Sequence, residues 1–212
     1  MNYKVYNLLA EFNTNAYLLW DEVSLEAVII DPANESKILK KEILKLKLNI
    51  KYIINTHGHG DHIGGNAFFV KSFPKSKLCI HKEDALMLLY PELNLSMYWD
   101  SGVVSPASEI QLAGGDVLKL GENELKIIHT PGHTEGGISI YVDNLVFAGD
   151  TLFARGIGRT DLPGGNYDTL INSIREKLFK LPKNTIVLPG HGSETTIGLE
   201  MAENPFVNFQ TH

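Results

Sequence analysis

Four potential metal ligands fall within six consecutive residues, His57-Gly58-His59-Gly60-Asp61-His62. The apolar run 51–55 precedes them and predicts a strand, and loops at strand ends commonly carry binding residues. Gly58 and Gly60 allow the backbone to bend so that the side chains can converge. Imidazole and carboxylate groups suit zinc, iron and manganese. We therefore predict a metal site, and further ligands from elsewhere in the chain must complete it.

Three more residues follow apolar runs and lie among glycines or other small residues. They are His133 in Thr130-Pro131-Gly132-His133, Asp150 in Phe147-Ala148-Gly149-Asp150, and His191 in Leu188-Pro189-Gly190-His191. Each alone is typical of a turn or a helix cap, but beside the first cluster they favour metal binding. We expect the strand-end loops to gather at one edge of the fold. His81, His129 and His212 lack this pattern, and we predict structural roles for them.

The composition limits the class of protein. The 212 residues are 43% hydrophobic, which allows one sizeable core or two small ones. The formal net charge of -6 gives no support to nucleic-acid binding and weak evidence against an anionic membrane surface. No apolar run approaches the roughly 20 residues of a membrane span, and the N-terminus lacks a signal-peptide pattern. We expect a cytoplasmic protein that binds neither nucleic acid nor membrane.

Cys79 is the single cysteine, so a disulfide within the chain is impossible. It lies in the apolar stretch 77–80, which favours a buried strand residue over a nucleophile.

Short β-rich runs alternate with helical patterns along the chain. The predicted strands are 17–20, 27–30, 51–55, 78–81, 116–120, 125–129, 138–142, 145–148 and 185–188. The predicted helices are 36–48, 63–73, 82–89, 167–179 and 196–202. The segment 90–113, with Tyr98 and Trp99, is predicted as a loop or lid, and an ordinary connection is the alternative. The pattern favours an α+β fold in a single domain, 1–212, with two sheets face to face and helices outside.

The ligand pattern resembles that of the metallo-β-lactamase superfamily, whose signature is His-x-His-x-Asp-His followed by His, Asp and His. The resemblance covers essentially the whole chain and implies an αββα sandwich of two mixed sheets. It also implies that Asp31, which ends the 27–30 strand, braces the histidine loop. The implied ligands are His57, His59 and His133 for a first metal, Asp61, His62 and His191 for a second, and Asp150 as a bridge between them.

Two departures narrow the subfamily. Asp150 stands where the commonest class of true β-lactamases carries cysteine, and His59 stands where flavodiiron proteins carry glutamate. Antibiotic hydrolysis and oxygen reduction at a diiron site are therefore disfavoured. The runs 149–165, with Gly-Arg-Thr-Asp-Leu-Pro-Gly-Gly, and 189–206 resemble the short bacterial glyoxalase II-like hydrolases. The C-terminal helical domain of classical glyoxalase II is not expected here, which leaves the carrier thiol open.

The resemblance implies a dinuclear thioester hydrolase. Two divalent metal ions, with zinc favoured and iron or manganese as alternatives, would share a hydroxide that attacks a hydroxyacyl thioester such as S-lactoylglutathione. Asp61 and Asp150 are the implied catalytic carboxylates. Arg159 and Arg155 are candidates to bind a substrate carboxylate, although an ion pair such as Arg159 with Asp161 is the alternative.

Other reactions use the same fold. Persulfide dioxygenases share the full histidine cluster and the Gly-Arg-Thr-Asp stretch, but they hold one iron through positions that match His57, His133 and Asp150 and leave the other positions without a metal. Around the last histidine they typically read Pro-Ala-His-Asp-Tyr, whereas this chain reads Pro-Gly-His-Gly-Ser. A lactonase or a phosphodiesterase could use all seven ligands. A non-catalytic member would be expected to have lost ligands, and none of the seven is missing here.

Overall fold

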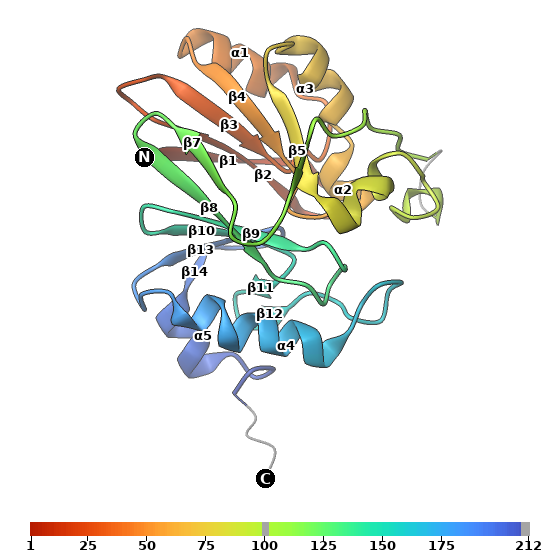
Figure 1. Ribbon diagram of the computed structural model, residues 1–212, viewed down its shortest axis with the longest axis vertical. Coiled ribbons are helices and arrows are strands. Elements are labelled where there is room, and N and C mark those ends of the chain that lie inside the picture. Colours follow the sequence, from red (N-terminus) through yellow and green to blue (C-terminus); the bar gives the residue numbers. More distant parts are fainter. Residues whose placement is uncertain (99–101, 209–212) are drawn as a thin grey trace.

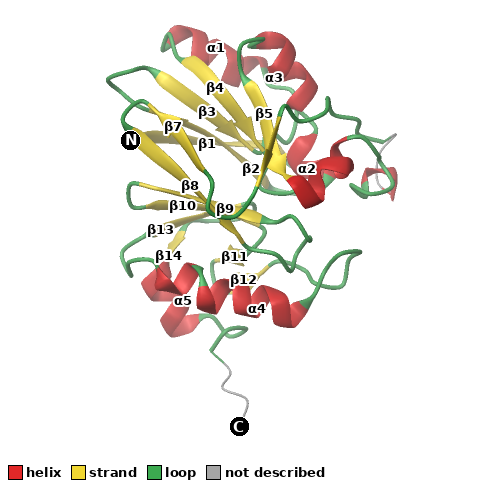
Figure 2. Ribbon diagram, in the orientation of Figure 1, coloured by secondary structure: helices red, strands yellow, loops and turns green. Residues whose placement is uncertain are grey.

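The computed structural model describes residues 1–98 and 102–208. Two six-stranded sheets pack face to face, and helices cover their outer faces (Figures 1 and 2). This is the αββα arrangement that the sequence predicts. Trp99 and His212, for which we predict a role in a lid and a structural role, lie outside the described residues.

The first sheet has the order β1-β2-β3-β4-β5-β6. Strands β1 to β3 are antiparallel neighbours, and β3 to β6 run parallel, so the sheet is mixed. Its strands are β1 (Asn2–Leu9), β2 (Thr14–Trp20), β3 (Glu26–Ile30), β4 (Asn49–Ile54), β5 (Lys77–His81) and β6 (Ile110–Leu112).

The second sheet has the order β14-β13-β10-β9-β8-β7, and only the β10–β13 pair is parallel. Hairpin turns join β7 to β8 at Gly121-Glu122 and β9 to β10 at Asp143-Asn144, where Gly121 and Asp143 have positive φ. Its strands are β7 (Val117–Leu120), β8 (Asn123–His129), β9 (Ile138–Val142), β10 (Leu145–Gly149), β13 (Ile186–Pro189) and β14 (Thr195–Thr196); β11 (Leu152–Phe153) and β12 (Gly156–Ile157) form a separate ribbon.

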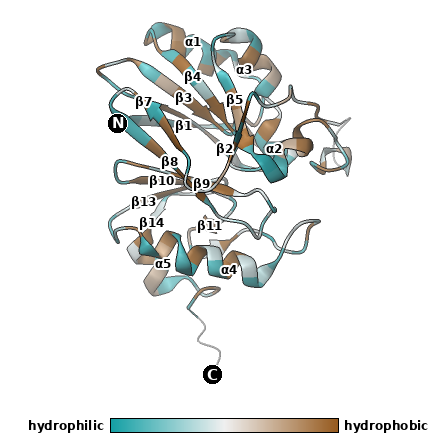
Figure 3. Cartoon of the chain, in the orientation of Figure 1, coloured by the Kyte–Doolittle hydropathy of each residue, from teal (hydrophilic) through white to brown (hydrophobic). Residues whose placement is uncertain are grey.

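Alternation along the strands builds three layers of buried side chains. Leu19 and Val28 face the second sheet, and their neighbours Leu18 and Ile29 face the helices. Helices α1 (Lys37–Lys45), α2 (Gly60–Ile63) and α3 (Asn66–Ser72) lie against the first sheet, and α4 (Tyr167–Glu176) and α5 (Ile197–Glu203) against the second. Figure 3 shows hydrophobic colour concentrated in the strands and mixed on α4 and α5, as amphipathic helices require. Cys79 is buried in the layer between the sheets, as predicted.

Several predicted elements need correction. The helix expected over 63–73 is split into α2 and α3, because Gly64 and Gly65 press against backbone carbonyls of the 32–34 turn. The helix expected over 82–89 is a 3₁₀ helix, η1 (Lys82–Leu88). The segment 90–113 is not wholly irregular: it contains the short 3₁₀ helix η2 (Ser96–Tyr98) and strand β6. Strands β1, β6, β11, β12 and β14 lie outside the predicted strands.

None of the helices within the described residues is long and apolar enough to cross a membrane.

Candidate metal centre

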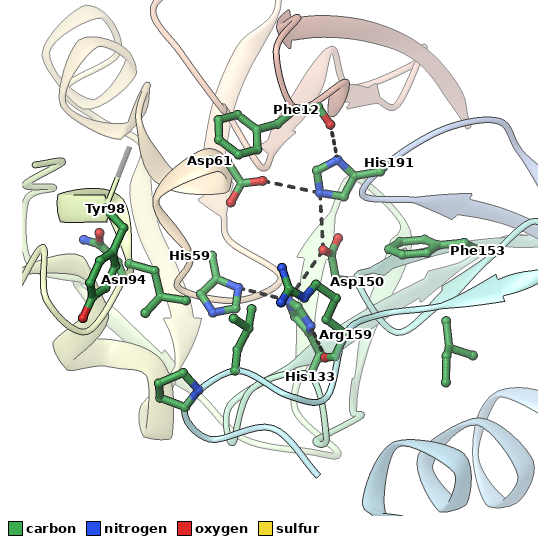
Figure 4. Close-up of a pocket in the computed structure, with 14 residues that line it drawn as sticks. Phe12, His59, Asp61, Asn94, Tyr98, His133, Asp150, Phe153, Arg159 and His191 are labelled. Atoms are coloured by element: carbon green, nitrogen blue, oxygen red, sulfur yellow. Dashed lines mark hydrogen bonds and ion pairs between the residues drawn. The ribbon is translucent and has the colours of Figure 1, made fainter. Parts of the chain in front are cut away.

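The seven predicted ligands converge at one edge of the sandwich, where several strands end. The run 57–62 follows β4, and α2 begins within it. His133 follows β8, Asp150 follows β10, and His191 follows β13. Figure 4 shows five of the seven around one cavity, with Asp61 and His191 on one side and His59 and His133 on the other. The expectation that the strand-end loops gather at one edge is confirmed.

The possible ligand atoms form three overlapping groups. Within each group the atoms lie within 4.8 Å of one another. The groups are His57, His59 and His133; His57, His62 and Asp150; and Asp61, His62 and His191. Because the middle group shares residues with both others, the arrangement fits two cations side by side.

The first group, His57, His59 and His133, is referred to below as the histidine end. His59 Nδ1 lies 2.9 Å from His133 Nε2, and the three rings meet nearly edge to face. The exposed fraction of each of the three residues is 5% or less. Only nitrogen atoms converge here.

The third group, Asp61, His62 and His191, is referred to below as the carboxylate end. His191 Nε2 lies 3.2 Å from His62 Nε2 and 3.4 Å from Asp61 Oδ2. Asp150 lies between the two ends, with Oδ2 3.5 Å from His133 Nε2 and 3.3 Å from His191 Nε2. Its carboxylate is therefore placed to serve both ends.

Unsatisfied polar atoms give a direct test of whether a cation fits this cluster. Three buried side-chain atoms have no hydrogen-bond partner among the described residues: His57 Nε2, His59 Nε2 and Asp150 Oδ1. Each such atom costs on the order of 1–3 kcal/mol when it is buried unsatisfied. Imidazole and carboxylate lone pairs are the donors that zinc, iron and manganese prefer, so the residues fit a metal.

Backbone carbonyls fix which ring nitrogen carries a proton in two imidazoles. The carbonyl of Arg159 lies 2.7 Å from His133 Nδ1, and that of Phe12 lies 2.8 Å from His191 Nδ1. A carbonyl can only accept, so Nδ1 donates in both residues. A neutral ring then presents an Nε2 lone pair toward the cluster, as a metal ligand must.

Asp31 holds the histidine loop from behind. Its Oδ1 accepts a hydrogen bond from Thr56 N at 2.7 Å, and its Oδ2 accepts one from Thr56 Oγ1 at 2.6 Å. Oδ2 also lies 3.0 Å from His62 Nδ1. Asp31 has a φ of 49°, a conformation that aspartate tolerates better than most residues. These contacts match the bracing role that the resemblance implies.

The two ends differ electrostatically. Burial drives the pKa of His57 well below its ordinary value and lowers that of His59 to about 3, so both are neutral. Burial also opposes charge on His62, but Asp61, Asp150 and Asp31 raise its pKa to about 9. His191 is only partly buried; burial opposes its charge, yet hydrogen bonds with Asp150 and Asp61 raise its pKa to about 11. The carboxylate end therefore attracts positive charge.

A cavity of about 580 Å³ opens above the two ends (Figure 4). Its walls are mainly apolar, and the lining residues beyond the cluster are Phe12, Asn94, Leu95, Tyr98, Phe153, Ile157, Arg159, Leu162 and Pro163. Tyr98, in the predicted lid segment, is 81% exposed and borders this cavity.

The two candidate arginines are placed differently. The guanidinium of Arg159 pairs with Asp161 at 2.8 Å, as the alternative interpretation expects. Arg159 also borders the cavity, and its contact with a substrate carboxylate stays a prediction. Arg155 is not among the lining residues, and its guanidinium pairs with Glu203.

Sequence reasoning missed residues that hold the ligand loops. Asn15 Nδ2 donates to the carbonyls of Pro189 and Gly192, on either side of His191. Gly60 N donates to the carbonyl of Asn94, which ties the start of α2 to the 90–113 segment. The polar pair Thr14-Asn15 at the head of an otherwise apolar strand was the available signal for the first contact. No local pattern signals the second.

His81 and His129 lie apart from the three ligand groups, as predicted. Their rings stack with centroids 4.1 Å apart, and each residue ends a strand of a different sheet.

Comparison with known proteins places this geometry in a family. The metallo-beta-lactamase superfamily model matches residues 9–191. The chain is 38% identical to hydroxyacylglutathione hydrolase GloC of Haemophilus influenzae, over 98% of this chain and 99% of that protein.

Three solved structures are similar over nearly the whole chain. They are BLEG-1, a B3 metallo-beta-lactamase (TM-score 0.92, 35% identity, 98% of this chain and 100% of the other); TTHA1623 in a di-iron-bound form (0.80, 34%, 94% and 98%); and ETHE1 from Myxococcus xanthus (0.79, 28%, 97% and 84%). The chain belongs to the metallo-beta-lactamase superfamily of metal-dependent hydrolases.

Proposed function

We propose that the protein is a dinuclear metallohydrolase that cleaves a hydroxyacyl thioester such as S-lactoylglutathione. The observation that carries the proposal is the complete carboxylate end, Asp61, His62 and His191, beside a complete histidine end. A reaction that needs one metal would leave the carboxylate end without a metal. The similarity to GloC supports the thioester as substrate.

The proposed metals are held by His57, His59 and His133 at one end and by Asp61, His62 and His191 at the other, with Asp150 shared. Two divalent cations held there would lower the pKa of a bound water toward neutrality and polarise a substrate carbonyl. We propose zinc, although the same donors suit iron or manganese.

The side chains of the protein orient the reactants. Asp61 is held by contacts with Thr14 Oγ1 at 3.4 Å and His191 Nε2 at 3.4 Å, which suits a ligand with a fixed orientation better than a mobile base. A thiolate leaving group has a pKa of about 8.5, so it departs without a general acid. The chain therefore needs no separate proton donor beside the cavity.

The cavity walls suit the part of the substrate that does not react. Phe12 and Phe153 lie near His191, and Leu162 and Pro163 follow Arg159. Such walls exclude water from the non-reacting arm, and Arg159 is placed to meet a carboxylate at the rim. The carrier thiol is identified by comparing thioesters of different thiols as substrates.

A panel of substrates tests the proposal on protein whose metals have been quantified. S-lactoylglutathione is compared with a β-lactam, a lactone and a phosphodiester, and a glutathione persulfide assay with oxygen uptake runs beside them. The β-lactam is included because of the similarity to BLEG-1. We expect two metals per chain and thioester cleavage as the fastest reaction.

The rival is a persulfide dioxygenase with a single iron, and the similarity to ETHE1 keeps it open. One iron per chain with oxygen uptake, and no thioester cleavage, would establish that rival instead.

A further inference from the structure

Asp84 is a buried carboxylate outside the predicted ligand set. It lies in the 3₁₀ helix η1, directly after β5, and is 1% exposed. Burial of a carboxylate is costly unless donors surround it. Burial raises the pKa of Asp84, and hydrogen bonds from its neighbours oppose that rise. The position of these donors shows what the carboxylate does.

All three donors come from the two loops that carry the histidine end. Asp84 Oδ2 accepts from Gly58 N at 3.0 Å, and Gly58 stands between His57 and His59. The same oxygen accepts from Thr134 Oγ1 at 2.7 Å, and Thr134 directly follows His133. Oδ1 accepts from Gly136 N at 2.7 Å. One side chain thus links two loops separated by more than seventy residues in sequence.

Two glycines allow this close approach. A Cβ at Gly136 would lie 2.5 Å from Asp84 Oδ1 and 2.6 Å from Asp84 N. A Cβ at Gly58 would lie 2.4 Å from Met87 Cβ, also in η1. Both loops therefore pack directly on η1, and a larger residue would displace one of them.

We propose that Asp84 is a positioning residue that sets the distance between the His57–His59 loop and the His133 loop, and so the metal affinity of the histidine end. The inference rests on the proposed function, because it assumes that these three histidines bind a metal. Asp84 itself contacts none of the three imidazoles through a hydrogen bond; it holds the backbone and side-chain groups between and beside them.

The test is the Asp84→Asn variant. An amide keeps the size of the carboxylate but replaces one acceptor by a donor group. Thr134 can reverse its hydroxyl, whereas the backbone N–H of Gly58 or Gly136 loses its acceptor. The loops are then tied by fewer bonds without a cavity in the core.

Glu200→Gln is the matched control. Glu200 is fully buried and also accepts three hydrogen bonds, from Arg155 N, Thr195 Oγ1 and Asn204 Nδ2. None of these three donors lies in the loops that carry the histidine end. The control therefore reports the general cost of neutralising a buried carboxylate.

Cobalt(II) affinity is measured by absorption with a competing chelator, in a His191→Ala background that disables the carboxylate end. We expect Asp84→Asn to weaken binding roughly 10–100-fold, the range for residues that orient metal ligands. Glu200→Gln should leave the affinity unchanged, although it lowers the melting temperature. Thr134→Val, which removes one donor, should weaken binding by less and guards against misfolding of Asp84→Asn.

Two outcomes would overturn the inference. Unchanged cobalt affinity in folded Asp84→Asn and Thr134→Val shows that the link does not set the site. An equal loss in Glu200→Gln shows a general stability effect. Both leave the proposed function standing, provided that the wild-type protein binds two cobalt ions. A wild-type protein that binds none would instead contradict the proposed function itself.

Discussion

The histidine end and the carboxylate end use similar ligands in opposite electrostatic settings. At the histidine end, burial lowers the pKa of His57 and His59, so these ligands are ready to donate at neutral pH. At the carboxylate end, Asp61 and Asp150 raise the pKa of His62 and His191, so a cation must replace protons. Burial therefore sets the pKa values at the histidine end, and neighbouring carboxylates set them at the carboxylate end.

The difference indicates separate roles for the two ends. At the histidine end, His57 and His59 need no proton release, and Asp84 holds the ligand loops, so this end should fill first. The carboxylate end is partly open, with His191 side-chain exposure of 24%. It should bind its metal more weakly and with a strong dependence on pH.

The largest effect is expected from the residue that the two ends share. Asp150→Ala removes the carboxylate that lies near both His133 and His191, so both proposed metals would lose a ligand. Thioester hydrolysis should fall by roughly 10²- to 10³-fold, the loss typical when a group that stabilises developing charge is removed. Steady-state kinetics and metal content measure the change. Retained activity would show that the bridging role is wrong.

Variants of single ends should separate them. His191→Ala should leave one metal per chain at the histidine end, and His59→Ala should weaken the first metal instead. Both should lower hydrolysis by more than the roughly 10–100-fold typical of residues that orient ligands, because each removes a ligand outright. Elemental analysis after dialysis gives the metal count. Equal metal content in His191→Ala and His59→Ala would contradict the contrast between the two ends.

Much of this site could be predicted from sequence because its signals are local. The run 57–62 concentrates four ligands in one loop, and His133, Asp150 and His191 each follow an apolar strand and a small residue. Most of the longer strands could also be predicted, because they are short apolar runs bounded by turn residues. The similarity of this pattern to a known family then allowed each position to be assigned.

The parts that could not be predicted depend on contacts between distant segments. Asp84 sits in a stretch with a helical pattern, and nothing local shows that its carboxylate meets Gly58 and Gly136. Strand β1 lacks a clear alternation, since none of its residues is fully buried. The split between α2 and α3 depends on the 32–34 turn, which packs against Gly64 and Gly65.

The pH dependence of stability should differ between metal-free and metal-loaded protein. Because the folded pKa of His62, about 9, and that of His191, about 11, exceed the ordinary 6.5, their stabilising contribution is complete below pH 6.5. It is lost as pH rises through 9 and beyond. The pKa values of His57 and His59 are lowered, so these residues reduce the stability of the folded protein only as the pH falls below 6.5.

The urea concentration at the unfolding midpoint of metal-free protein should therefore decrease as the pH is raised from 7 to about 9.5. Metal-loaded protein should show a smaller decrease. Equal pH profiles for the two forms would contradict the contrast between the ends.

The smallest effect concerns the rim of the cavity. Arg159→Gln should raise KM for a substrate with a carboxylate by up to about fivefold, because its guanidinium is exposed and already paired with Asp161. Arg155→Gln is the matched control, since Arg155 pairs with Glu203 outside the cavity lining. Michaelis–Menten kinetics on both variants measure the effect. A larger rise of KM in Arg155→Gln than in Arg159→Gln would show that Arg155, and not Arg159, meets the substrate carboxylate.

A stepwise metal titration tests the central claim most directly. Zinc is added to metal-free protein while S-lactoylglutathione hydrolysis and proton release are followed together. We predict that hydrolysis rises mainly with the second equivalent, together with proton release from His62 and His191. Full activity at one equivalent, or activity that requires iron and oxygen, would contradict a dinuclear hydrolase.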